Sequence, residues 1–306
     1  MFNSTSNVFY KFLYFVGYGS LFLISLVILL ILAFFLYNNR SYFSIKKLLN
    51  ENKKKRIEDK PDLLNKPLKE FYINTSHNSY ISNIQNGSIL LKHTVGDVLK
   101  MGARCIEIDI HNVDGNPVVA HGNDKIITTT HLQLDSVLDE IVNEGFKTSD
   151  PLILFLEVVN TDYDVMFKIN TLLKEKFKDR LLDYKYKMNY RGFDKINVID
   201  APIKDLLNKI IIINTTRNND GLENILDDNS KIINNSTDDV LNYTKDSMRR
   251  VYLNESILSM MSNNFDPVPY FDKRTNMAAL NFNSFDPYLY KNLKMFEEYS
   301  FKHFLE

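Results

Sequence analysis

Side chains suited to acid–base or metal chemistry recur where apolar runs of this sequence end. His77 and Asn78 follow the strand-like run FYI, and His121 ends the run PVVAHG. Glu107 and Asp109 are two residues apart in RCIEIDIHN, so in a strand they would point to one face. Because carboxylates in such apolar surroundings are seldom buried unless they are paired or bound to a metal, these positions predict a functional site.

Two further runs carry polar groups of the same kind. Glu157 interrupts LILFLEVV, and Arg250 and Tyr252 alternate in RRVY. Two histidines could share acid–base work near neutral pH, and a cation together with an arginine would clamp an anionic group such as phosphate. Each residue alone also fits a plainer role, as a turn residue, a surface ion pair or a structural arginine.

Oxygen donors without cysteine favour a hard cation, and Ca²⁺ suits a loose set of ligands better than Mg²⁺ does. The predicted ligands are Asn78, Glu107, Asp109 and Glu157.

The elements that must position these groups alternate between short apolar runs and amphipathic stretches. This alternation indicates βα units with a mostly parallel sheet, and a (β/α) barrel fits the length of the chain. In such a barrel, polar residues at the carboxyl ends of the strands meet above the sheet. Strands are expected over 71–76, 104–112, 117–122, 152–160, 209–216, 247–253 and 276–282, and helices over 94–102, 134–146 and 165–177.

The composition narrows the class of protein. A hydrophobic content of 44% suits a globular core, and the near balance of 37 basic and 38 acidic residues argues against a general nucleic-acid binder. The single cysteine, Cys105, excludes an intramolecular disulfide and a cysteine-based zinc site.

Residues 12–37 form an apolar segment that contains no charged residue. A helix of this length crosses the roughly 30 Å hydrocarbon layer of a membrane. A cleaved signal peptide would have an apolar region of about 7–15 residues, so an uncleaved transmembrane anchor is expected instead. The basic linker at 38–65 predicts that the rest of the chain faces the cytosol. The linker either holds the domain near anionic lipid or is a solvated connection that only sets the topology.

The polar motifs together resemble a known family. TSHNSY, RCIEIDIHN with PVVAHG, and LILFLEVV are similar to the X region of eukaryotic phosphoinositide-specific phospholipase C. RRVYL, SNNFDP at 262–267 and NMAALNF are similar to its Y region, in the expected order. The resemblance implies an α/β fold, a distorted TIM barrel built from an X half at 66–216 and a Y half at 241–306. An acidic, Asn-rich X–Y linker at 217–240 would join the halves, and the transmembrane helix would precede them.

The resemblance also implies an activity, the Ca²⁺-dependent cleavage of inositol phospholipids to diacylglycerol and inositol phosphates. Carried over by position, His77 would stabilise the phosphoryl transition state and His121 would be the general acid toward diacylglycerol. Glu107 or Asp109 would be the base for the inositol 2-hydroxyl. Because the attack is intramolecular, positioning that hydroxyl would be a large part of catalysis.

Substrate binding would fall to Arg250 and Tyr252, which match residues that hold the inositol head group. One strand departs from the family pattern. Where the family usually has a lysine-rich stretch such as KILLKGKK, this chain has KIIIINTT, with Ile213 and Thr215 at lysine positions. Lys209 remains as a predicted substrate-binding residue, less suited to phosphate. Since a charge-assisted contact is worth about 1.5–3 kcal/mol, a preference for less phosphorylated inositides is expected.

Three other functions compete with this interpretation. A bacterial metal-independent phospholipase C or a glycerophosphodiesterase would also be a barrel phosphodiesterase. The carboxylate cluster argues against the metal-independent enzyme, and RRVY and NMAALNF argue against both. A catalytically inactive, membrane-tethered inositide-binding protein would have lost a histidine or a calcium ligand, and none is lost here.

The acidic linker at 217–240 would gate the site by repulsion from anionic membrane, or it would be a plain solvated loop.

Overall fold

The N-terminal part of the chain forms a unit of its own. The chain divides into Met1–Lys47 and Leu48–Glu306. Residues 20–33 are helical, and helix α2 spans Arg40–Glu51. Among the described residues, no helix is both long and apolar enough to cross a membrane, and both ends of the predicted anchor 12–37 lie partly outside them. The computed structural model describes residues 15, 18, 20–33, 36, 40–51, 54–81, 94–123, 127, 130–159, 162–216, 218–237, 244–254 and 263–306.

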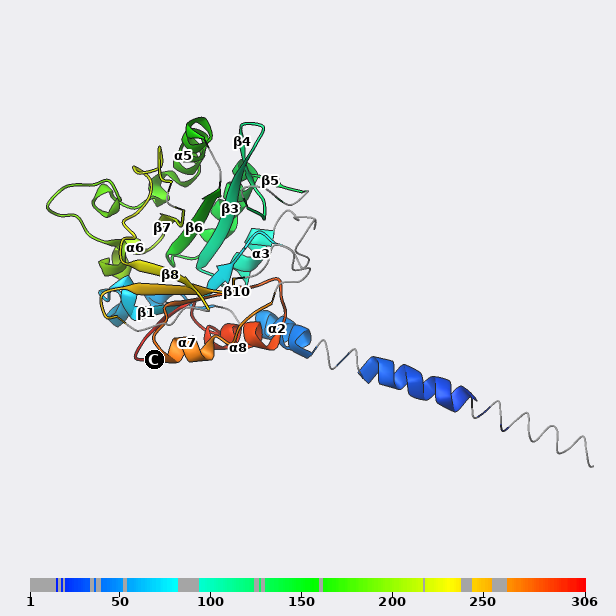
Figure 1. The fold of residues 1–306 in the computed structure, drawn as a ribbon. Helices are drawn as coiled ribbons and strands as arrows, with labels where there is room; N and C mark the ends of the chain where they lie inside the picture. The colour runs from blue at the N-terminus through cyan, green and yellow to red at the C-terminus, as the bar shows by residue number, and fades with distance from the viewer. Residues whose placement is uncertain are drawn as a thin grey trace, which may run out of the picture. The chain divides into compact units, whose positions relative to one another are not determined.

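The second unit is built around a curled, mainly parallel sheet of nine described strands (Figure 1). Its parallel ladders run in the order β7-β6-β3-β2-β10-β9-β8. The predicted distorted TIM-like α/β fold is therefore confirmed. No ladder between β7 and β8 occurs in the part of the chain that the structure describes. The strands are β2 (Thr75–His77), β3 (Cys105–Val113), β6 (Leu152–Val159), β7 (Ile210–Asn214), β8 (Ile232–Ser236), β9 (Met248–Tyr252) and β10 (Met277–Asn281).

The run at 117–122 is a strand, but it does not join the parallel barrel. Strand β4 (Asn116–Val119) pairs antiparallel with the outer part of β3, and β5 (Leu132–Gln133) pairs with β4. Asp114 and Gly115 both adopt a positive φ, as a tight hairpin turn requires, so the chain folds straight back without a helix. The return brings residue 120 to the level of Asp109, whose carbonyl oxygen accepts from the Ala120 amide at 3.2 Å.

Helices and short strands enclose the sheet on its outer side. Figure 1 shows α7 and α8 along β10, where Phe271 and Phe296 pack on Ala278. The helices are α3 (Thr94–Lys100), α4 (Leu134–Gly145), α5 (Tyr163–Phe177), α6 (Ile203–Leu206), α7 (Val268–Asp272) and α8 (Pro287–Met295). Strands β1 (Phe71–Ile73) and β11 (Phe301–His303) pair antiparallel. The 3₁₀ turns are Ile57–Asp59, Pro61–Leu63, Leu68–Glu70, Lys178–Arg180, Tyr184–Tyr186 and Val198–Asp200.

Alternate residues of neighbouring strands change from apolar to polar toward the carboxyl ends. On β3 and β6 the paired residues are Cys105 with Ile153, Glu107 with Phe155, and Asp109 with Glu157. The pair Cys105 and Ile153 belongs to a continuous apolar cluster with Ile211, Met248 and Met277. Burying each such side chain stabilises the fold by about 1.5–3 kcal/mol. The apolar cluster therefore forms a firm base beneath the polar residues.

The segment expected to be a flexible linker is largely ordered. Within 217–240, residues 232–236 form β8, and Leu222, Ile225 and Leu226 are buried. Lys187 Nζ lies 2.7 Å from Asp227 Oδ1, and both residues are buried. The Asp227 amide donates to the Ile212 carbonyl oxygen, and its Oδ2 accepts from the Ile212 amide, so the segment is fastened to β7.

The polar, weakly periodic sequence of this segment predicts a flexible connection, and that expectation was wrong over these residues. That 217–240 joins the X and Y halves stays a prediction. Polar residues here bond the chain to itself rather than to solvent, which a count of Asn and Asp cannot reveal. The hypothesis that this segment gates the site by charge repulsion is also weakened, because two of its acidic residues are already neutralised. Asp227 pairs with Lys187, and Asp228 pairs with Lys195 at 3.1 Å. Residues 217 and 238–240 lie outside the described residues.

Replacing Asp227 tests whether this clip holds the barrel together. Asp227→Ala leaves the buried Lys187 ammonium without its carboxylate, so the free energy of unfolding should fall by about 3–5 kcal/mol. Urea denaturation measures it. Asp139→Ala is the matched control, because it removes an exposed partner while Lys176 keeps Asp135, and it should cost less than about 1 kcal/mol. Equal losses in the two variants would contradict the role of the clip.

Candidate active site

His77 ends β2 and is held at both ring nitrogens. Its Nδ1 lies 3.2 Å from Asn281 Oδ1 on the neighbouring β10, and its Nε2 lies 3.5 Å from Glu107 Oε2. The Asn281 amide nitrogen donates to the Asn263 carbonyl oxygen, which turns Oδ1 toward the histidine. Since both ring nitrogens face acceptors, the arrangement suits the doubly protonated, cationic ring.

Asn78 turns the chain sharply after β2. Its φ of 44° lies in the left-handed region, which asparagine tolerates better than most residues do. The turn lets the Asn78 amide donate to Glu107 Oε2 at 3.2 Å, and the Ser79 hydroxyl accepts from the Glu107 amide at 3.1 Å. No hydrogen bond to another described residue engages the Asn78 side chain, so its amide oxygen is available to a ligand.

Glu107 and Arg250 form a buried ion pair across the barrel. Arg250 Nη2 lies 2.7 Å from Glu107 Oε2, and Arg250 is fully buried. Burial alone would raise the pKa of Glu107. The charges of Arg250 and His77 and the Asn78 amide outweigh it, so the pKa is lowered and the carboxylate stays ionised.

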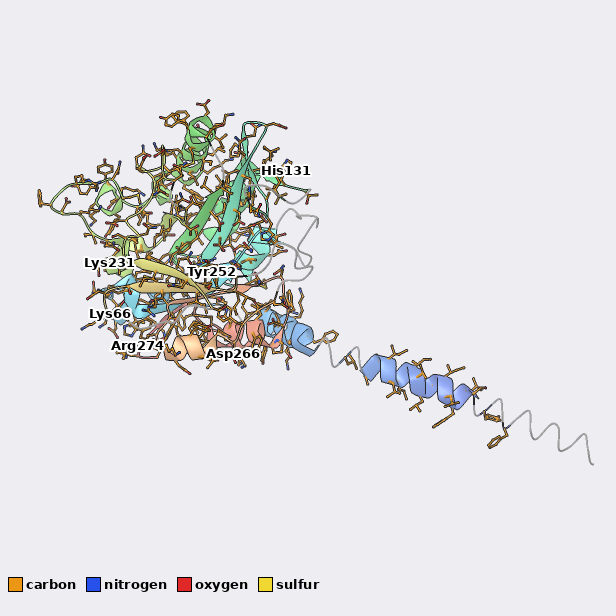
Figure 2. All side chains as sticks on the ribbon, viewed as in Figure 1. Lys66, His131, Lys231, Tyr252, Asp266 and Arg274 are labelled. Carbon is orange, nitrogen blue, oxygen red and sulfur yellow. The ribbon has the colours of Figure 1, made fainter. Side chains whose placement is uncertain are left out.

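Arg250 is itself fixed from three sides. Its Nη1 donates to Asn234 Oδ1 on β8 at 2.8 Å, and its guanidinium lies 4.8 Å from the Phe155 ring centroid. The ring of Tyr252, two residues further along β9, lies 5.4 Å away. Figure 2 labels Tyr252 and Lys231, which lie at opposite ends of the β8–β9 pair. A cation sandwiched between aromatic faces keeps a defined position.

Tyr80 connects Asp109 to His121. The Tyr80 hydroxyl donates to Asp109 Oδ2 at 2.6 Å and lies 3.2 Å from His121 Nδ1. Burial and the nearby Asp109 charge raise the pKa of Tyr80 well above its ordinary value, so the phenol keeps its single proton. With that proton given to Asp109, the phenol oxygen accepts from an Nδ1–H of His121. With the proton on Nδ1, the Nε2 of His121 is the basic nitrogen of the neutral ring.

Glu157 is the negative group that the protein compensates least. It pairs in register with Asp109, and no hydrogen bond joins it to another described residue. Burial and the charges of Asp109 and Glu107 raise its pKa to about 8, against a smaller opposing effect of Arg250. Asp109 Oδ1 is buried without a hydrogen-bond partner among the described residues. The site therefore has oxygen donors and negative charge to spare.

This donor set fits the predicted hard cation. Carboxylate and amide oxygens without sulfur are the ligands of Ca²⁺, and a cation would relieve both the raised pKa of Glu157 and the partnerless Asp109 oxygen. The described residues contain no ready-made group of three or more His, Cys, Asp or Glu side chains in a metal-holding arrangement. The ligand prediction thus stands on the donors and their charge rather than on a closed site.

The structure brings the predicted residues together, with Lys209 as the exception. Lys209 precedes β7, so it lies at the amino end of the strand, where its Nζ donates to the Asp179 and Leu181 carbonyl oxygens. A strand rises about 3.3 Å per residue, so β7 separates Lys209 from the site by well over 10 Å. The prediction that Lys209 binds substrate there is not supported. Ile213 is buried, and Thr215 Oγ1 donates to the Leu156 carbonyl oxygen at 3.2 Å.

Sequence reasoning missed four supporting residues. Tyr80 lies in TSHNSY and Phe155 lies two residues before Glu157, so the spacing of two along a strand could have indicated the latter. Asn281 lies in NMAALNF, where an asparagine at a strand end was the available signal. Asn234 lies within the supposed linker, and nothing in that polar segment marked it.

The site agrees with the comparison against known families. The sequence model of the family described as phosphatidylinositol-specific phospholipase C, X domain, matches residues 64–216, half of the chain. The chain belongs to this family. The matched span contains His77, Glu107, Asp109, His121 and Glu157, so these five predicted residues come from the X domain.

Curated relatives are named as phosphodiesterases. A 1-phosphatidylinositol 4,5-bisphosphate phosphodiesterase of Dictyostelium discoideum is 37% identical over 95 residues, 30% of this chain and 12% of that protein. The corresponding enzyme 1 of Saccharomyces cerevisiae is 33% identical over 126 residues, 41% of this chain and 14% of its own length. These matches support the eukaryotic type within the family, over a small part of each relative.

Solved structures share the fold. PLC21 of L. pealei superposes with a TM-score of 0.67 at 20% identity, over 78% of this chain and 37% of that chain. A calcium-dependent phosphoinositol-specific phospholipase C of a Gram-negative Pseudomonas species, in its apo form, gives a TM-score of 0.50 at 12% identity, over 80% and 97%. At such identities the likeness concerns the fold alone, and it extends beyond the X domain into the second half of the barrel.

Neutralising the two neighbouring glutamates should have opposite effects on stability. Glu157 has a raised pKa, so its protonated form is favoured in the folded protein. Its contribution to the free energy of unfolding is full below pH 4.5 and is lost as the pH rises through about 8. In chelator, Glu157→Gln should therefore unfold at higher urea than the parent at pH 9, and the difference should vanish near pH 5. Glu107→Gln leaves Arg250 buried without its partner and should cost about 3–5 kcal/mol. Destabilisation by Glu157→Gln at pH 9 would contradict the assignment.

Removing the Tyr80 hydroxyl should allow His121 to populate both of its neutral tautomers instead of one. In the parent at pH 8, ¹⁵N NMR should show the pyrrole-type shift at Nδ1 of His121, because Nδ1–H faces the phenol oxygen. In Tyr80→Phe the two neutral tautomers should mix. His131, which is exposed, provides an internal reference whose signals should not change. A pyrrole-type Nε2 in the parent would overturn the hydrogen-bond direction.

Proposed function

We propose that this chain is a Ca²⁺-dependent phosphoinositide phospholipase C that cleaves inositol phospholipids to diacylglycerol and inositol phosphates. One observation carries the proposal. His77 lies beside Glu107 and His121 lies beside Asp109, two buried carboxylates of β3, and each histidine also has a second partner that orients it. The names of the relatives point the same way, although the matched regions cover only 12% and 14% of their lengths.

The reaction begins with attack of the inositol 2-hydroxyl on the phosphorus of the same molecule. The hydroxyl proton passes to Glu107 or Asp109, and the bond from phosphorus to the glycerol oxygen breaks. His121, when it is protonated at both ring nitrogens, donates its Nε2 proton to the leaving diacylglycerol oxygen, while the Nδ1–H contact to Tyr80 holds the ring in position. The Nε2–H of His77, whose 3.5 Å approach to Glu107 is too long for a strong hydrogen bond, would turn to the phosphoryl oxygen on which negative charge grows, while Nδ1 stays with Asn281. Water then opens the cyclic phosphate.

A calcium ion would be held by a set of oxygen donors at the mouth of the barrel. When bound, it would stabilise the negative charge of the phosphoryl group and favour ionisation of the 2-hydroxyl. Glu157 must give up its proton to become a ligand, so metal binding should weaken below pH 8. The proposed ligands are Asn78, Glu107, Asp109 and Glu157.

Among the described residues that the candidate site brings together, few cations are available to ring phosphates. Arg250 is committed to Glu107 and Asn234, and Ile213 and Thr215 supply no charge. We therefore infer a preference for less phosphorylated inositides, with the Tyr252 ring stacking on the inositol. The relatives are named for the 4,5-bisphosphate, so a preference for less phosphorylated lipids would distinguish this chain from them.

The proposal includes a location. The uncharged segment 12–37 followed by the basic residues of 38–65 supports a single-pass anchor with the catalytic unit on the cytosolic side. Protease protection of the full chain in sealed membranes tests this topology. Complete digestion of the unit from the cytosolic side is expected, and protection would overturn it.

Vesicle assays on the full chain test the activity. With Ca²⁺, the chain should release water-soluble inositol phosphate from vesicles of phosphatidylinositol, faster than from its bisphosphate, and a chelator should stop release. His121→Ala should lower the rate at least about 10²-fold because the leaving group loses its acid. His131→Ala, at an exposed position, should leave it unchanged.

Three results would overturn parts of this proposal. Vesicle binding without cleavage would indicate the inactive inositide-binding protein. Cleavage in chelator would remove the calcium assignment, and equal rates on both lipids would remove the head-group preference.

A further inference from the structure

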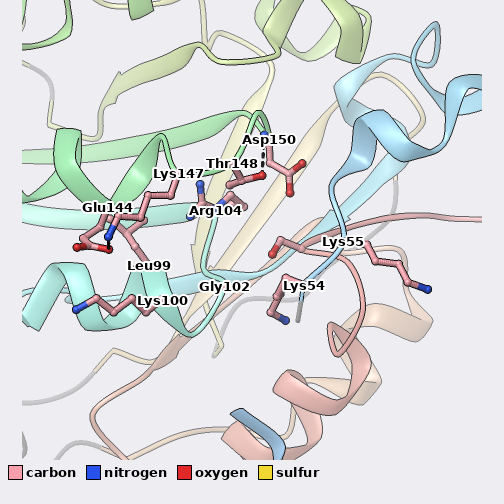
Figure 3. A pocket seen from close by; sticks show the side chains of 11 residues that line it. Lys54, Lys55, Leu99, Lys100, Gly102, Arg104, Glu144, Lys147, Thr148 and Asp150 are labelled. Atoms are coloured by element: carbon pink, nitrogen blue, oxygen red, sulfur yellow. Dashed lines mark hydrogen bonds and ion pairs between the residues drawn. The ribbon is translucent and has the colours of Figure 1, made fainter. Parts of the chain in front are cut away.

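A cavity with many charged side chains in its lining lies at the amino end of the barrel, away from the candidate active site. Figure 3 shows this cavity from close by. Its volume is about 150 Å³, and it opens where β3 begins and where α3 and α4 end. At about 30 Å³ per water molecule, it has room for a tetrahedral oxyanion with a few waters. Its lining holds five basic and two acidic side chains, with Arg104 at the centre of the view.

The three outer lysines of the cavity already have carboxylate partners. Lys55 lies 3.1 Å from Glu298, Lys100 lies 3.1 Å from Asp97, and Lys147 lies 2.7 Å from Glu144. These exposed pairs account for the rim without any ligand. They leave the two inner cations, Arg104 and Lys54, to be explained.

The inner cations donate only to main-chain oxygens among the described residues. Arg104 is 3% exposed, and its Nε and Nη1 donate to the Ala103 and Gly145 carbonyl oxygens at 2.8 and 2.6 Å. No hydrogen bond to a described residue uses its Nη2. Lys54 Nζ donates to the Phe296 carbonyl oxygen. Burial and the charge of Arg104 lower the pKa of Lys54 to about 8, as expected for two cations facing one another.

The carboxylates near the inner cations already have other partners. Glu297, which acts on Lys54 more strongly than Asp150 does, also pairs with Lys294. Asp150 acts on both cations, and its Oδ1 accepts from the Ile57 amide at 2.8 Å. Two hydroxyl-bearing residues, Thr148 and Ser300, complete the wall. Buried charge is rarely left without compensation, so an excess of cation with spare hydroxyl donors favours a bound anion.

The backbone keeps this space open for Lys54. Gly102 has a φ of 93°, and a Cβ built there would lie 2.2 Å from Lys54 Cε. Any larger residue at 102 would push the lysine out of the cavity. Each inner cation donates one hydrogen bond to a carbonyl oxygen at a helix end, Arg104 at the end of α4 and Lys54 at the end of α8, where a positive charge is favourable. These bonds do not account for Arg104 Nη2, which bonds to no described residue, or for the hydroxyl-lined space.

We propose that this cavity binds a phosphate group between Arg104 and Lys54, with Thr148 and Ser300 as further donors. The guanidinium edge suits paired oxygens of a phosphate, and the ammonium adds a point charge. The phosphate comes either from a soluble inositol phosphate or from a lipid head group. The site is separate from the catalytic residues, so it holds whether or not the chain cleaves lipid.

Lys54→Met in the full chain tests the site, because methionine keeps the apolar stem and removes the charge. Inositol trisphosphate at constant ionic strength should raise the thermal midpoint of the parent, and chloride should not. The apparent affinity should fall at least tenfold in Lys54→Met and stay within twofold in the matched control Lys55→Met. Each variant is compared with its own ligand-free midpoint. Thr148→Val, expected to lose severalfold in affinity, replaces Lys54→Met should that variant fail to fold.

Sedimentation with vesicles distinguishes the two sources of phosphate. Phosphatidylinositol phosphate vesicles that bind the parent better than Lys54→Met indicate a lipid head group, whereas a midpoint shift without this difference indicates a soluble ligand. Absence of a shift and of a vesicle difference would overturn the proposal. Equal loss in Lys54→Met and Lys55→Met would also overturn it, since the inner cation would then have no special role.

Discussion

The ion pair between Glu107 and Arg250 is the constraint on which the rest of the barrel mouth depends. It joins β3 to β9 inside the sheet, where neither charge reaches water. An ionised Glu107 can then accept from the Asn78 amide and face His77, so the turn and the histidine take their positions from it. Removing one partner would strand the other charge, and this cost makes the geometry specific rather than adaptable.

A second constraint is the two-residue repeat of the strands. It places Cys105, Glu107 and Asp109 at successive depths, so one strand contributes to the apolar base, to the ion pair and to the polar level of the candidate site. The buried charge of Glu107 is tolerable because Arg250 pairs with it, while Ile153 and its neighbours below fix the strand spacing. Reactivity and stability are thus carried by alternating positions of the same segments.

Much of this could be predicted from sequence because the signals were local. Strong apolar runs marked β3, β6, β7 and β10, and embedded carboxylates marked the site. What failed depended on contacts far apart in the chain. β8 reads as polar because Asn234 serves Arg250, the hairpin at Asp114 hides the antiparallel direction of β4, and Lys209 was assigned without regard to which end of β7 it occupies. The anchor at 12–37 stays a prediction.

The open edge between β7 and β8 has a consequence for how the barrel is assembled. The two halves expected from the sequence meet through the β2–β10 ladder, while the Asp227 clip fastens the segment between them to the first half. The site takes Glu107 from the first half and Arg250 and Asn281 from the second. Either half alone would hold an uncompensated charge and an unsatisfied histidine. The segment matched by the X-domain family is therefore not chemically self-sufficient, and the first half becomes a site only when its second half arrives.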